Sequence, residues 1–183
     1  KIVYPENGQA DERSVFLTGE AYFNVAKDSL KPFIVKTENL SVKVLGTQFN
    51  VRDYPDENVT MVTLNEGKVE LQTTCGKTVV LEPLQQLIYN NLTQEVKGTE
   101  VLPDNASAWK DGRMVFDSVE IDEIVKTLER QYDISINVDS TLLSDESYSV
   151  KFKCDENIYQ VMSVLQDMIG ECSFVIEGNT VKM

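Results

Sequence analysis

The chain has 183 residues, enough for one ordinary domain or two small ones, and 42% of them are hydrophobic, which favours a folded protein over a disordered one. It contains no histidine, which excludes Ser-His-Asp and Cys-His nucleophile systems and histidine-bearing zinc sites. The net charge of −13 would repel a phosphate backbone, so we expect no nucleic-acid partner. No apolar run approaches the roughly 20 residues that a membrane-spanning helix needs.

From residue 13 to about residue 97, short runs rich in β-branched residues alternate with turn residues. This pattern predicts an all-β domain over residues 1–103, built from stacked short strands in a sandwich or a solenoid-like ladder. One alternating stretch is interrupted by Asn65-Glu66-Gly67, a turn sequence that predicts a β-hairpin at this point.

After a polar stretch near residue 105 the pattern changes to strands alternating with helices, which predicts a second domain over residues 104–183. Apolar residues at helical spacing predict helices near 119–132 and 157–169, and the second set repeats the first 37 residues further on. We therefore expect an α+β domain of two duplicated β-α-β units, with Leu128 and Leu165 at matching core positions. In the second helix, Asn157 and Gln160 have the spacing of an N-terminal cap.

The candidate chemical groups give little support to catalysis. The adjacent carboxylates are Asp122-Glu123, Asp145-Glu146 and Asp155-Glu156. Neighbouring residues on a helix do not face each other, so we expect no acid–base pair and no enzyme. The acidic stretch 53–58 lacks the calcium-loop pattern and is predicted to form a polar turn.

The three cysteines, Cys75, Cys154 and Cys172, lack the C-x-x-C spacing of a metal site. We interpret them as buried thiols. The sequence therefore predicts neither a metal site nor a cofactor.

Several long motifs lie in order along the chain: G-E-A-Y-F-N-V-A-K-D at 19–28, P-F-I-V at 32–35, V-L-G-T-Q-F-N-V at 44–51 and W-K-D-G at 109–112. Together they resemble the FecR family of sigma-factor regulators, most closely its Bacteroidetes branch. The similarity covers nearly the whole chain. One departure is Leu84, which stands where the family usually has a glycine after L-x-P.

The resemblance implies a fold and a role. The second domain should be similar to the short N-terminal domain of secretins and TonB-dependent transducers. The chain would be the periplasmic sensor region of a single-pass inner-membrane anti-sigma factor. It would receive a signal from the N-terminal domain of a TonB-dependent outer-membrane transducer and relay it to an extracytoplasmic-function (ECF) sigma factor. The family's cytoplasmic sigma-binding segment and its membrane helix would lie outside this sequence.

We expect the transducer to bind by adding a strand to an edge strand of the second domain, a common mode of recognition. Two runs combine β-forming residues with lysines, which often protect an exposed edge. The candidate partner-binding residues are Ser149, Val150, Lys151, Phe152 and Lys153 in the first run and Thr180, Val181, Lys182 and Met183 in the second. The alternative function is a β domain that binds a carbohydrate or metabolite directly, which an aromatic-lined pocket would favour.

Overall fold

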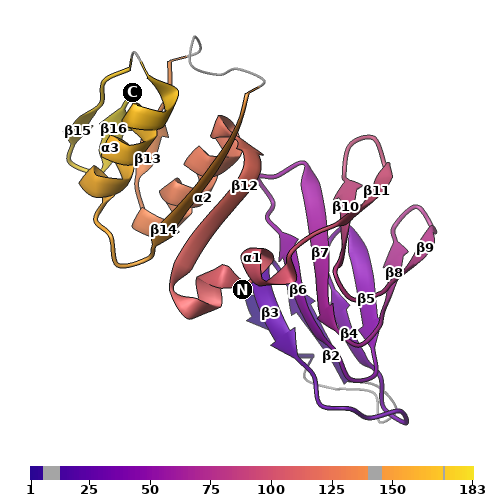
Figure 1. The fold of residues 1–183 in the computed structure, drawn as a ribbon. Coiled ribbons are helices and arrows are strands. Elements are labelled where there is room, and N and C mark those ends of the chain that lie inside the picture. The colour runs from indigo at the N-terminus through magenta and orange to yellow at the C-terminus, as the bar shows by residue number, and fades with distance from the viewer. Residues whose placement is uncertain (6–12, 140–145, 171) are drawn as a thin grey trace. The chain divides into compact units, whose positions relative to one another are not determined.

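The structure is a computed structural model that describes residues 1–5, 13–139, 146–170 and 172–183 (Figure 1). It divides into two compact units, Lys1–Ser107 and Ala108–Met183. Each unit has a hydrophobic core of its own. Among the described residues, no helix is both long and apolar enough to cross a membrane.

The first unit is almost entirely β-structure. Its strands are β1 (Ile2–Val3), β2 (Arg13–Leu17), β3 (Gly19–Asn24), β4 (Phe33–Lys36), β5 (Leu40–Val44), β6 (Gln48–Asp53), β7 (Val59–Glu66), β8 (Val69–Thr73), β9 (Thr78–Leu81), β10 (Gln85–Asn90) and β11 (Val96–Glu100). A four-residue helix, α1 (Pro103–Ala106), follows them.

These strands form two sheets, in the orders β1-β2-β4-β5-β8-β9 and β11-β10-β7-β6-β3. Alternate side chains of both sheets are buried in one common core, as the period of a β-strand requires. Val35 and Val42 enter it from the first sheet and Phe49 and Leu64 from the second, all fully buried. The unit is therefore a β-sandwich, which decides between the two expected architectures.

The expected hairpin at Asn65-Glu66-Gly67 is wrong. Asn65 and Glu66 still belong to β7, and the chain bends at Gly67. β7 pairs with β6 and β10 in one sheet, whereas β8 pairs with β5 and β9 in the other. Gly67 has φ +93°, and a Cβ at this position would lie 2.8 Å from the Gly46 carbonyl oxygen. This bend thus carries the chain between the sheets in a conformation that requires glycine.

The described residues of the second unit form two long helices and two small sheets. Its elements are a 3₁₀ helix η1 (Ala108–Asp111), β12 (Arg113–Glu120), α2 (Ile121–Tyr132), β13 (Ser135–Asn137), β14 (Ser147–Lys153), α3 (Ile158–Ile169), β15 (Val175–Glu177) and β16 (Thr180–Lys182). β12 and β14 form an antiparallel pair, and the other sheet has the order β13-β16-β15.

Both predicted helices are confirmed, and they begin 37 residues apart. Leu128 and Leu165 are fully buried in the core of this unit, as their matching positions predicted. The predicted cap is also present, because the Asn157 side chain accepts a hydrogen bond from the Gln160 backbone N–H and the Gln160 side chain accepts one from the Asn157 N–H.

Candidate functional site

The first candidate run, residues 149–153, lies on β14, an edge strand of the β12–β14 ribbon (Figure 1). One face of the ribbon is apolar and packs into the core: Phe116 and Phe152 are buried, with ring centroids 6.3 Å apart. On the other face, Arg113 lies opposite Lys153 and Val115 lies opposite Lys151. The ribbon is therefore fixed by its inner face and presents lysines on its outer one.

The hydrogen bonds define which backbone groups of β14 remain available. The Cys154 N–H donates to the Gly112 carbonyl over 2.9 Å. Along an antiparallel strand, the backbone N–H and C=O groups of successive residues face the partner strand and face away from it in turn. The backbone groups of Phe152 and Val150 therefore face β12. Those of Ser149, Lys151 and Lys153 face away from it. The backbone carbonyl of Lys153 is already bonded within a turn, where it accepts a hydrogen bond from the Glu156 N–H over 3.2 Å.

In the part of the chain that the structure describes, β14 pairs with β12 alone. Ser149 and Lys151 are both exposed. Their N–H and C=O groups thus form a short unpaired edge, the feature that strand addition uses. The run 149–153 is placed where the sequence expectation needed it, although binding there stays a prediction.

The second candidate run, Thr180, Val181, Lys182 and Met183, is not an edge, and that expectation is wrong. β16 lies between β13 and β15, pairing in parallel with the first and antiparallel with the second. Val181 is fully buried, the Lys182 ammonium lies 2.6 Å from the Glu177 carboxylate, and the Met183 N–H donates to the Asn137 carbonyl. Because its backbone is paired on both sides, β16 has no free edge to which a partner could add a strand.

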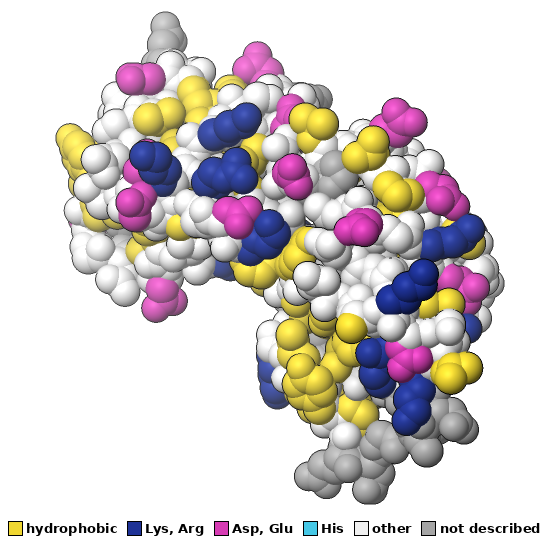
Figure 2. Space-filling view, turned by 60° about the horizontal axis from the view of Figure 1, so that its bottom comes forward, with side chains coloured by type: hydrophobic (Ala, Val, Ile, Leu, Met, Phe, Trp, Pro, Cys, Tyr) yellow, Lys and Arg dark blue, Asp and Glu magenta, His cyan; other side chains and the backbone are white. Residues whose placement is uncertain are grey.

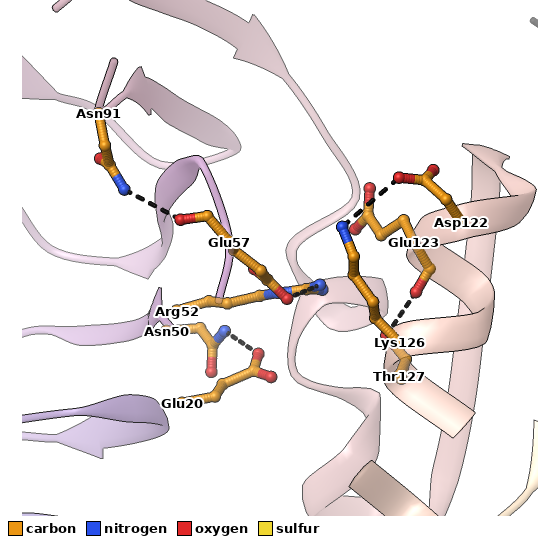
Figure 3. A network of polar contacts seen from close by, with 9 residues as sticks. All are labelled: Glu20, Asn50, Arg52, Glu57, Asn91, Asp122, Glu123, Lys126 and Thr127. Atoms are coloured by element: carbon orange, nitrogen blue, oxygen red, sulfur yellow. Dashed lines mark hydrogen bonds and ion pairs between the residues drawn. The ribbon is translucent and has the colours of Figure 1, made fainter. Parts of the chain in front are cut away.

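In the first unit, the acidic residues of the stretch 53–58, which was considered as a calcium loop, form hydrogen bonds with neighbouring groups of that unit. Glu57 receives two hydrogen bonds from the Arg52 guanidinium, of 2.7 and 2.9 Å, and its carbonyl accepts from the Asn91 side chain over 3.4 Å (Figure 3). One carboxylate oxygen of Asp53 accepts from Asn39 and Thr60 over 2.9 Å. These contacts fix the predicted polar turn.

In the second unit, the carboxylate pairs at the helix starts also make local contacts. Asp122 lies 3.5 Å from the Lys126 ammonium one turn along α2 (Figure 3). The Glu156 carboxylate accepts from the Lys153 N–H over 3.4 Å, and Asp145 lies outside the described residues. Nowhere in the described ranges do three His, Cys, Asp or Glu side chains converge as a metal site requires.

An open depression of about 550 Å³ lies at the end of the β12–β14 ribbon. Its lining is Asp111, Gly112, Arg113, Lys153, Cys154 and Asp155, which includes no aromatic ring. Burial, and then the nearby Asp155 carboxylate, raise the pKa of the Cys154 thiol, which disfavours the reactive thiolate. The expectation of three buried thiols is wrong: Cys75 is exposed in the turn between β8 and β9, and Cys154 and Cys172 are only half-buried.

Two regions of the chain match known protein families. Residues 1–70 match the family model described as FecR protein, and residues 113–183 match the one described as FecR, C-terminal. No curated protein matches the chain.

Two crystal structures of a candidate anti-sigma factor from Parabacteroides distasonis ATCC 8503, at 1.65 and 2.50 Å resolution, are similar to this chain. The TM-scores are 0.89 and 0.88. In both comparisons the sequence identity is 30%, and the match covers 99% of this chain and 84% of the other. The chain therefore belongs to the FecR family of anti-sigma factors, whose members regulate sigma factors.

Proposed function

We propose that this chain is the periplasmic sensor region of a transmembrane anti-sigma factor. It binds the N-terminal domain of a TonB-dependent outer-membrane transducer and passes the signal to an ECF sigma factor. Family membership supports the sigma factor as the regulated partner. The observation that carries the proposal of a protein partner is the unpaired edge of β14 at Ser149 and Lys151.

The organisation of the second unit gives this proposal further support. Two helices of twelve residues and two small open sheets are packed on one core, an arrangement that we compare with the short N-terminal domain of secretins and TonB-dependent transducers. Small open sheets have edge strands, and two domains of this kind can join by edge pairing without a preformed cavity.

The alternative function is direct binding of a carbohydrate or metabolite by the β domain, and the depression beside Cys154 gives it no support because that depression lies in the second unit. Small-molecule sites are usually enclosed and lined by apolar and aromatic side chains. The depression beside Cys154 is open, and charged groups such as Arg113 and Asp155 contribute to its lining. The depression therefore gives no support to a small-molecule site in the second unit either.

An affinity-capture experiment tests the proposal. The purified chain is immobilised and exposed in turn to the N-terminal domain of each TonB-dependent transporter of the same organism, with a glycan panel in parallel. We expect one domain, or a small number of them, to be retained. Failure of every domain to bind would contradict the proposal, and retention of a glycan by the first unit would favour the alternative.

A further inference from the structure

The basic side chains of the second unit are concentrated around the β12–β14 ribbon. Residues 108–183 contain seven basic and fifteen acidic side chains. Four of the seven, Lys110, Arg113, Lys151 and Lys153, lie on the ribbon or in the helix that leads into it. Figure 2 shows several dark blue side chains close together on this unit, with magenta acidic side chains among them. The same segments carry three acidic side chains, Asp111, Asp117 and Glu120, so this region is much less acidic than the rest of the unit. The Asp117 carboxylate lies 3.5 Å from the Ser149 hydroxyl, so the surplus of positive charge is at Lys151 and Lys153, where it favours a partner of opposite charge.

Only part of this basic group is available to a partner. The Asp111 carboxylate lies 2.9 Å from the Lys110 ammonium and 3.8 Å from the Arg113 guanidinium. The ammonium groups of Lys151 and Lys153 make no hydrogen bond or ion pair to any residue that the structure describes, and both residues are exposed. They are two residues apart on one strand, so they point to the same face of the ribbon.

Available charge and available backbone coincide on β14. Lys151 provides both an unpaired ammonium group and an outward-facing N–H and C=O. On the opposite face of the strand, Tyr148 and Val150 are half-buried against the core. If a partner strand paired with this edge, every second side chain of that strand would lie beside Lys151 and Lys153, and the remaining side chains would lie beside Tyr148 and Val150.

We infer that the partner contributes an extended segment whose side chains alternate between acidic and apolar, and that this segment pairs with β14 at Ser149 and Lys151. This inference rests on the proposed function and specifies its partner. The backbone ladder supplies much of the affinity. The acidic side chains of the segment face Lys151 and Lys153, where they speed its association and select it over other segments. Its apolar side chains extend the apolar face of the ribbon, the face that contains Phe116 and Phe152.

A proline substitution tests the backbone pairing. Lys151→Pro removes an N–H that the fold itself does not use, and Lys151→Ala is the matched control because it removes the same charge but keeps the N–H. In a titration with the transducer domain, followed by calorimetry, we expect the proline variant to bind about fivefold to tenfold more weakly than the alanine variant. Val150 is unsuitable for this test because its N–H faces β12.

A charge reversal tests the acidic character of the segment. Lys151→Glu combined with Lys153→Glu should weaken binding by about tenfold or more at low salt, mainly through slower association, and should make the remaining affinity less sensitive to sodium chloride. Lys182→Glu is the control: it reverses a lysine on the inner strand β16, where we expect little effect. Because these changes lie on exposed side chains, they remain decisive if the proline variant fails to fold.

The outcomes separate the two proposals. If the wild-type chain binds no transducer domain, the proposed function is wrong and the inference falls with it. If the wild-type chain binds but the double glutamate variant binds equally well, the segment is not acidic and the inference is wrong, while the proposed function stands. Equal binding by the proline and alanine variants of Lys151 would likewise overturn strand pairing at this edge.

Discussion

At position 84, glycine should give a more stable first unit than alanine. Leu84 is the third residue of the turn Glu82-Pro83-Leu84-Gln85, in which the Gln85 N–H donates to the Glu82 carbonyl over 3.2 Å. Its φ of +70° is the value that a type II turn requires at this position, and glycine is preferred there because it has no Cβ. The leucine is therefore held in a conformation that its side chain disfavours.

Neighbouring contacts hold Leu84 in this conformation. Its N–H donates to the Leu64 carbonyl over 3.1 Å, and its own carbonyl accepts from the Val101 N–H over 2.9 Å. The side chain is 57% exposed, and the burial that remains is lost in the glycine and the alanine variant alike, so the comparison of these two variants isolates the backbone term. The left-handed conformation costs a residue with a Cβ about 1–2 kcal/mol, from which the greater chain entropy of glycine subtracts about 0.5–1 kcal/mol.

Leu84→Gly should therefore be more stable than Leu84→Ala by about 0.5–1 kcal/mol, or roughly 3–6 °C in the melting temperature of a unit of this size. Differential scanning calorimetry of the whole chain measures this difference on the transition of the first unit. Leu84→Ala is the matched control, since it removes the exposed side chain but keeps the Cβ. A glycine variant that melts at or below the alanine variant would refute the reasoning from backbone strain.

Three further predictions concern the cores and the titrating side chains. Leu128→Ala and Leu165→Ala should each lower the free energy of unfolding by about 2–5 kcal/mol, because both side chains are fully buried. Urea titration followed by the fluorescence of Trp109, the only tryptophan, measures this, and a loss below about 0.5 kcal/mol would contradict the core assignment. The Thr73 hydroxyl, 3.0 Å from the Cys75 sulfur, holds the pKa of that exposed thiol below its ordinary value, so iodoacetamide should alkylate Cys75 well before Cys154; equal rates by mass spectrometry would oppose this. Burial raises the pKa of Tyr132 in the folded protein above its value of about 10 in the unfolded chain. The stabilisation linked to this shift is therefore complete below a pH of about 10 and is lost as the pH rises through the higher pKa of the folded state. Tyr132→Phe should make the unfolding free energy of the second unit less dependent on pH above 10, and an unchanged dependence would contradict this.

The elements that local patterns determine could be predicted from the sequence. Each long helix has a continuous apolar stripe along one side, and that spacing alone placed Leu128 and Leu165 in the core. The Asn157–Gln160 cap is equally local, because both partners lie within one helical turn. The family resemblance likewise rested on contiguous motifs, and the family assignment is confirmed.

Strand partners could not be predicted in the same way, because alternation gives a strand's faces but not its neighbours. β7 and β8 follow each other across Gly67 yet belong to different sheets. Residues 180–183 look like a terminal edge, but β16 inserts between β15 and β13. One local signal was available there. Gly178 and Asn179 form a tight turn that predicts pairing of β15 with β16, and this pairing already uses one edge of β16.

The most direct test of partner binding is amide hydrogen exchange measured residue by residue on the chain alone and in the presence of the transducer's N-terminal domain. In the free chain, Ser149 and Lys151 should exchange quickly, whereas Val150 and Phe152, whose N–H groups face β12, should be protected. Addition of the domain should slow exchange at Ser149 and Lys151. Absence of new protection anywhere in the chain, or protection confined to residues 1–107, would contradict recognition through β14.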